Sequence, residues 1–185
     1  MYLVQTVAPL SEPITLEQAK DFMRILESDE DAIITAMIVS AREFAENYTN
    51  RQIMSATYEL YNSHYIQDMV MPKNPIQSVT KVEYMDETGV YQTLDAGLYY
   101  LYGENDVFKL RLEEDLPEYK EHKNAIKITF TAGYTTVPQS FLSYMKVFVS
   151  NIYENREFYV VGAKVDSMAN PLVVKMLDMY RVQPL

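Results

Sequence analysis

The spacing of the apolar residues changes twice along the chain, and this change most limits the folds available to it. Up to residue 51, apolar side chains recur every three or four residues, as on a helix with one buried face. From residue 52 to 135 the spacing falls to two, which is typical of strands, and from residue 136 it lengthens again. The sequence therefore predicts an α+β protein in which a small antiparallel β unit is inserted into a helical core.

Two helices are expected before the inserted unit. Thr15-Leu16-Glu17-Gln18 has the residues of a capping box, which begins the first helix. A second helix is predicted over residues 30–49, because acidic residues stand at its start and apolar residues follow at helical spacing through Tyr48. Asn50 then suits the left-handed conformation in which helices often end.

Strand patterns fill the inserted segment, and a helical pattern follows it. Ala125–Thr131 alternates most regularly, and Asp86-Glu87-Thr88-Gly89 is typical of a hairpin turn. A long helix is predicted over residues 138–158, and Asn170-Pro171 predicts the start of a short last helix after a linker. We therefore expect a helical core from residues 1–51 and 136–161, a β unit at 52–135, and a C-terminal linker and helical arm at 162–185.

The charge of the chain restricts its partners. The 185 residues carry a net charge of −10, and all of the excess acid lies before residue 136. A protein that grips phosphate backbones without regard to sequence needs a basic surface, so this distribution argues against tight DNA binding. The N-terminus lacks the pattern of a signal peptide, and no apolar run approaches the about 20 residues that span a bilayer. We expect synthesis in a cytoplasm and no membrane partner.

Signals for catalysis are weak. The chain has no cysteine, which excludes disulfides, thiol nucleophiles and zinc ribbons. His64 and His122 lack a nearby set of ligands, and the acidic run Glu113-Glu114-Asp115 is most simply a solvated loop. We therefore predict no catalytic residue, no metal and no cofactor. A hydrolytic enzyme is a distant alternative, which a pocket with converging carboxylates would support.

A binding module is the stronger alternative. Tyr99, Tyr100 and Tyr102 fall in the β unit, where their rings could stack on nucleic-acid bases or a small ligand. Modules of this kind add a basic groove, whereas residues 52–135 sum to a charge of −6. This reading is kept as the alternative function.

Several short segments, taken in order, resemble the head–tail connector proteins of tailed phages, the family of the lambdoid connector and related prophage proteins. No single segment is distinctive, but together they span nearly the whole chain. Asn50 stands where the family usually has glycine, and the tryptophan that the family often has near Tyr153–Glu157 is absent. The segments that carry the resemblance are Glu12–Lys20, Asp29–Ile34, Ala41–Glu43, Tyr48–Arg51, Pro75–Val79, Thr131–Tyr134, Val137-Pro138, Tyr153–Glu157 and Met176–Val182.

The resemblance implies a head completion or adaptor protein that is made in the bacterial host cytoplasm and lies at the head–tail junction of a virion. Such a protein forms a homo-oligomeric ring under the portal protein, extends the DNA channel, and docks the tail or a stopper protein. Its partners would be further copies of itself, the portal, a tail-side protein, and double-stranded DNA that passes through without specific binding. The net acidity suits a channel in which DNA must slide.

Two groups of residues are expected to make these contacts. The helices at 30–49 and 138–158 are predicted to build the core and part of the ring contact. The last helix follows a linker and carries an apolar stripe that either the parent domain or another subunit covers, and we expect it to act as a portal-facing arm. The predicted ring interface is Ile34, Ile38, Arg42, Phe148, Ile152 and Arg156, and the predicted arm is Leu172, Val173, Met176, Leu177, Tyr180 and Arg181.

Overall fold

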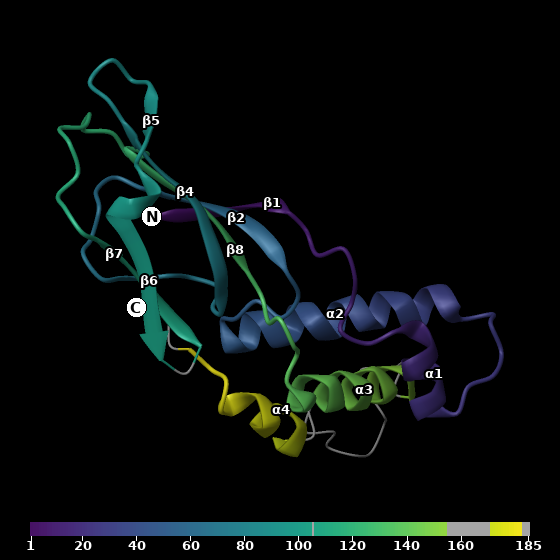
Figure 1. The fold of residues 1–185 in the computed structure, drawn as a ribbon. Coiled ribbons are helices and arrows are strands. Elements are labelled where there is room, and N and C mark those ends of the chain that lie inside the picture. The colour runs from purple at the N-terminus through teal and green to yellow at the C-terminus, as the bar shows by residue number, and fades with distance from the viewer. Residues whose placement is uncertain (105, 155–170, 183–185) are drawn as a thin grey trace, which may run out of the picture. The chain divides into compact units, whose positions relative to one another are not determined.

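The structure, a computed structural model, describes residues 1–104, 106–154 and 171–182, with the backbone alone at 171–174. The chain folds into two compact units (Figure 1). The β unit contains residues 1–10 and 54–135, and the helical unit contains the rest of the described chain. The chain therefore passes between the units three times, and each unit is assembled from segments that are distant in sequence.

The larger sheet of the β unit has five antiparallel strands. In spatial order they are β1 (Tyr2–Val7), β2 (Ala56–Asn62), β8 (Ile126–Ala132), β4 (Ile76–Met85) and β5 (Tyr91–Thr93). In the two neighbours β2 and β8, every second residue is buried, as the period of two in the sequence predicted. These two strands form the centre of the sheet.

A second sheet has three strands and shares a core with the first. Its order is β3 (Met69–Val70), β7 (Val107–Leu112) and β6 (Tyr99–Glu104), and a 3₁₀ turn at Ala96–Leu98 leads into β6. One cluster of buried side chains joins the two sheets, so the β unit is a two-layer structure around a single core. The larger members of that cluster include Leu60, Val82, Leu110, Leu112, Ile126, Ile128 and Phe130.

Four helices form the described part of the helical unit: α1 (Leu16–Met23), α2 (Asp31–Thr49), α3 (Gln139–Glu154) and α4 (Pro171–Asp178). The capping box at α1 is present as predicted, because the Thr15 hydroxyl accepts from the Gln18 amide and the Gln18 side chain accepts from the Thr15 amide. Asn50 ends α2 in the left-handed conformation, also as predicted. Helices α2 and α3 each contact all three other described helices and together form the centre of this unit.

The fold class predicted from the sequence is confirmed, and the domain boundaries differ at the N-terminus. Residues 1–10 were expected in the helical part, but β1 pairs with β2 and belongs to the β unit. The strand was missed because it lies at the edge of its sheet, where five of its six residues are exposed and the apolar pattern is lost. Residues 162–170, the expected linker, lie outside the described residues. Within the described chain, no helix combines the length and apolarity that crossing a membrane requires.

Hydrogen bonds to the carboxylate of Asp86 hold the turn of the β4–β5 hairpin. One oxygen, Oδ1, accepts from the amides of Thr88 and Val90 at 3.0 Å each and from the Thr88 hydroxyl at 2.6 Å. The side-chain amide of Gln92 donates to the other oxygen, Oδ2, at 2.7 Å, and Gly89 completes the turn with a φ of +90°. The side-chain bonds from Thr88 and Gln92, with the backbone bonds, lower the pKa of Asp86 to about 2. The charged carboxylate is therefore the form that holds the turn.

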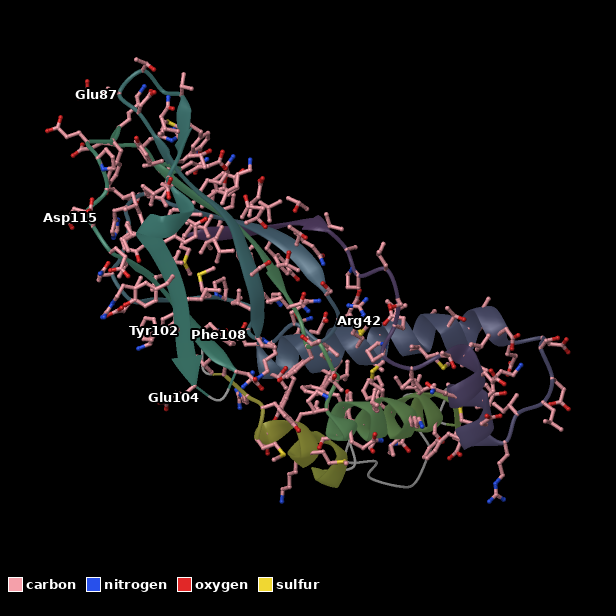
Figure 2. All side chains as sticks on the ribbon, viewed as in Figure 1. Arg42, Glu87, Tyr102, Glu104, Phe108 and Asp115 are labelled. Carbon is pink, nitrogen blue, oxygen red and sulfur yellow. The ribbon has the colours of Figure 1, made fainter. Side chains whose placement is uncertain are left out.

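This arrangement predicts a stabilising effect of Asp86 that depends on pH. A carboxyl group whose pKa is lowered by folding stabilises the protein above its unfolded pKa, near 4, and the effect is lost as the pH falls toward 2. We expect Asp86→Asn to lower the melting temperature at pH 7, and the difference from the parent protein to shrink between pH 4 and pH 2. Glu87→Gln removes the same charge at the exposed neighbouring position (Figure 2) and is the matched control. Equal effects of the two variants at pH 7 would contradict the prediction.

Candidate assembly surfaces

The buried face of α2 makes the core of the helical unit. Ile34 and Ile38 are 0% and 2% exposed, and Ala41 and Ala45 continue the same face. The buried side of α3 supplies Phe141, Tyr144, Met145 and Val149 to this core. Ile34 and Ile38 were predicted to lie at the ring interface, but the structure places both inside the subunit. A ring contact through α2 would therefore use the opposite face of the helix.

Arg42 lies at the centre of a buried network of charges (Figure 2). Its Nε donates to Glu12 at 2.7 Å, and its Nη1 donates to Glu46 at 2.9 Å, one turn further along α2. The other oxygen of Glu46 accepts from the Gln52 side chain at 2.8 Å and from the Ile53 amide at 3.0 Å. Glu12 and Ile53 lie at the two ends of the first segment of the helical unit, so the network fixes both ends of that segment.

The electrostatics of the network keep Arg42 charged. Burial alone lowers the pKa of Arg42, but the hydrogen bonds that it donates to Glu12 and the charge of Glu46 outweigh this effect, so the pKa is raised. Arg42 is 8% exposed, and its guanidinium is paired with the carboxylates of Glu12 and Glu46 in the same chain. Arg42 was predicted as a ring-interface residue, and the structure gives it a role within the subunit instead.

The exposed face of α2 has an unusual composition for the surface of a charged protein. No charged residue occurs between Asp31 and Arg42, which is nearly three turns of helix. Ala32, Ile33, Thr35, Ala36 and Ser40 are exposed there, and Ile33 alone is 47% exposed. A water-facing helix normally carries charges on this side. We call this group of residues the uncharged face of α2.

An aromatic cluster continues from the uncharged face onto α3. Phe44, which is 38% exposed, lies 5.4 Å from Phe148 and 6.3 Å from Tyr144 between ring centroids. Phe148 and Ile152 are half-buried on α3, and Arg156 lies outside the described residues. Of the six residues predicted for the ring interface, Phe148 and Ile152 are therefore the two that the structure describes as partly open to solvent.

The C-terminal segment packs on its own helical unit. The Tyr180 ring lies 4.6 Å from that of Phe141, and the carbonyl of Tyr180 accepts from Arg51 Nε at 2.5 Å. The Val182 amide donates to the Thr49 carbonyl at 2.9 Å, just before the end of α2. The Tyr48 hydroxyl donates to Asp178, and the guanidinium of Arg181 lies 5.4 Å from the centre of the Tyr48 ring.

These contacts separate the residues predicted for the portal-facing arm into some that hold it on its own unit and some that face solvent. Leu177 is fully buried and Tyr180 is half-buried, so both help to hold the segment on the parent unit. Met176 is 37% exposed and Arg181 is exposed, and the neighbouring Met179 is 75% exposed. The side chains of Leu172 and Val173 lie outside the described residues. Leu177 of the last helix is therefore covered by its own chain.

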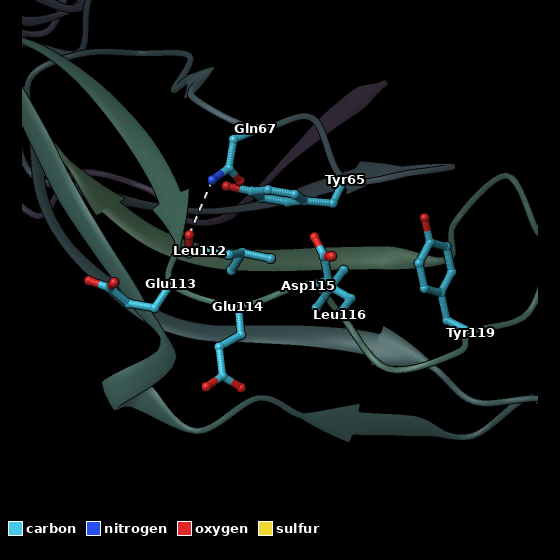
Figure 3. Close-up of a pocket in the computed structure, with 8 residues that line it drawn as sticks. All are labelled: Tyr65, Gln67, Leu112, Glu113, Glu114, Asp115, Leu116 and Tyr119. Carbon is cyan, nitrogen blue, oxygen red and sulfur yellow. Dashed lines mark hydrogen bonds between the residues drawn. The ribbon is translucent and has the colours of Figure 1, made fainter.

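A pocket of about 570 Å³ in the β unit is the candidate for a catalytic or ligand-binding site (Figure 3). Two of the residues that line it make structural hydrogen bonds: the Tyr65 hydroxyl donates to the Leu110 carbonyl, and the Gln67 side chain donates to the Leu112 carbonyl. Burial raises the pKa of Tyr65 to about 12, so this hydroxyl stays protonated at neutral pH. The acidic run 113–115 lines the pocket, but its three side chains are exposed and point in different directions in Figure 3. The described residues contain no three His, Asp or Glu side chains grouped to hold a metal ion.

The tyrosines proposed as a stacking surface are largely engaged. Tyr99 packs against the core of the β unit, and the guanidinium of Arg111 lies 5.3 Å from the centre of the Tyr102 ring. Tyr100 is 38% exposed and lies 5.9 Å from Tyr102. Arg111 itself is paired with Asp68, so it adds little positive charge toward a ligand. The cation that lies over the Tyr102 ring is therefore already neutralised by a carboxylate of its own chain.

A family model matches most of the chain. The family model for head completion proteins matches residues 12–182, which includes nearly all of both units. The chain therefore belongs to the head completion protein family and is a structural head–tail connector protein. The family gives no support to the ligand-binding alternative. No curated protein sequence matches the chain significantly.

Solved structures share the same fold. One is the neck of an empty gene transfer agent particle computed with C6 symmetry, with a TM-score of 0.80 and 20% identity, covering 100% of this chain and 97% of that chain. A chain from the virion of the native gene transfer agent particle gives a TM-score of 0.79 at 18% identity, with the same coverage. The neck of the native particle computed with C12 symmetry gives 0.77 at 19% identity, also with the same coverage. At these identities the likeness is one of fold.

The buried network predicts a large cost for removing Arg42 alone. Arg42→Ala leaves the buried Glu46 and the half-buried Glu12 without their cation, which we expect to lower the free energy of unfolding by about 3 kcal/mol. Glu43→Ala changes the exposed neighbouring position and should have little effect. Urea unfolding of the two variants checks this, and a cost for Arg42→Ala no greater than that for Glu43→Ala would show that the network adds no stability.

The C-terminal contacts predict that the last described residues stabilise the helical unit. Leu177→Ala should lower the free energy of unfolding by roughly 3 kcal/mol, because the side chain is fully buried. Met179→Ala, on the exposed side of the same segment, should leave stability nearly unchanged. Equal urea midpoints for these two variants would mean that the segment does not pack on the unit in solution.

Proposed function

We propose that the protein forms a homo-oligomeric ring at the head–tail junction of a phage-like particle, under the portal protein. The ring would extend the DNA channel and present a docking surface to the tail or to a stopper protein. The observation that carries this proposal is the family match over residues 12–182. The likeness of fold to neck proteins in particles computed with C6 and C12 symmetry agrees with it.

The uncharged face of α2, with Phe44, Phe148 and Ile152, is our proposed ring contact within the helical unit. Neighbouring copies that each carry a net charge of −10 repel one another, so a contact free of charge is favourable. Small residues such as Ala36 and Ser40 allow another helix to approach closely, and the exposed edges of the aromatic rings offer apolar area to bury. This assigns the contact to the helices expected from the sequence but to different side chains of α2.

The exposed side of the C-terminal segment is our proposed contact with the portal. Met176, Met179 and Arg181 face solvent there, whereas Leu177 and Tyr180 anchor the segment to its own unit. Residues 136–185 carry a charge of +1 in a chain that is otherwise acidic, so this region can meet an acidic or neutral protein surface without repulsion. The remaining acid suits a channel wall that DNA passes without being held.

Electron microscopy of the purified protein, alone and mixed with its portal protein, tests the proposal. We expect rings in at least one of the two samples, and Ile33→Glu should abolish them because it buries a charge in the proposed contact. Glu17→Gln, which changes an exposed charge on α1, is the control and should leave rings intact. Monomers in both samples of the parent protein would overturn the proposal.

A further inference from the structure

The first strand of the chain has an open edge. In the described structure β1 pairs with β2 on one side and has no strand on the other. All six of its residues are uncharged, and Tyr2, Val4 and Val7 are 46%, 41% and 49% exposed. Such an edge presents unpaired amides and carbonyls that can add another strand.

The usual protections of an edge strand are weak in β1. Proteins block exposed edges with lysine, with proline, or with a bulge that twists the strand away. β1 contains neither lysine nor proline, and its one irregularity falls between Gln5 and Val7, so Tyr2–Gln5 stay in regular register. An uncharged edge left open in this way indicates a surface that is covered after assembly.

A second open edge of equal length lies in the other sheet. In the described structure β6 pairs with β7 alone. It has six residues, the same number as β1, and carries no charge from Tyr99 through Gly103. The two edges belong to different sheets of the β unit. The free edge of β5, by comparison, has three residues and offers half the length for pairing.

We propose that, in the ring, β1 of one copy adds to the β6 edge of the neighbouring copy and joins their β units through main-chain hydrogen bonds. This inference rests on the proposed ring. A ring of more than two copies with cyclic symmetry needs two different, complementary surfaces on each subunit, and two open edges of equal length in different sheets supply such a pair. Pairing would bring Tyr2 and Val4 beside Tyr100 and Tyr102, and aromatic and β-branched side chains are favourable neighbours across strands.

Disulfide trapping tests the contact in a background that has no cysteine. Val4→Cys is combined with Tyr100→Cys in one protein and with Leu101→Cys in a second, since alternate residues of β6 point to opposite faces. After oxidation we expect one of the two to give a ladder of covalent oligomers on a gel that a reducing agent abolishes. Val4→Cys with Gln92→Cys, which probes β5, should give no ladder, and Val4→Cys alone should give no dimer.

The same samples, with and without portal protein, are viewed by electron microscopy. Rings with no ladder from either β6 pair would overturn the β1–β6 contact and leave the ring itself standing. A ladder from the β5 pair, or dimers from Val4→Cys alone, would also overturn it, because another edge or a second β1 would then be the partner. Absence of rings and ladders together would reject both this contact and the proposed function.

A charge on the open edge gives an independent measurement. Val4→Lys adds the residue that proteins use to block edges, at a position exposed in the subunit, so the fold should tolerate it. We expect it to raise the protein concentration needed for ring formation about tenfold, while Val4→Thr keeps the parent value. Equal concentrations for the two variants, at unchanged melting temperatures, would contradict the proposal.

Discussion

The buried ion pairs of Arg42 are the interaction on which the arrangement of the helical unit depends. A buried charge is costly unless every partner is present, and here the partners come from both ends of the segment 11–53. Glu12 fixes the place where the chain enters the unit, and Glu46, through Gln52 and Ile53, fixes the place where it leaves. With both ends fixed, the β unit can be inserted after residue 53 without loosening the helices.

The exposed surfaces are informative because their composition differs from that of the rest of the molecule. Tyr65 and Gln67 of the pocket in the β unit make structural hydrogen bonds, and its carboxylates face solvent. The uncharged face of α2 and the edges of β1 and β6 lack the charges that cover much of an acidic protein's surface. Contacts between copies of a structural protein need surfaces of this kind.

Features set by neighbouring residues could be predicted from the sequence, and features set by distant residues could not. The Thr15 cap and the Asn50 terminus follow from residues within one turn, and the α+β class follows from the change in period. Strand β1 is defined by a partner 50 or more residues away, and the pairing of Arg42 with Glu12 spans 30. The predicted ring interface included Ile34 and Ile38, which the structure buries inside the subunit. Helix α2 carries apolar residues on both faces, and periodicity alone does not say which face is buried.

The three passages of the chain between the units have a consequence for how the protein folds during synthesis. β1 leaves the ribosome first but has no partner until β2 is made, and the central strand β8 follows some 70 residues later. Likewise α2 must wait for α3 and for the segment that ends at Val182. Contacts this distant in sequence form slowly. Neither unit can close until most of the chain has emerged, and the open strand β1 is exposed to wrong partners throughout that interval.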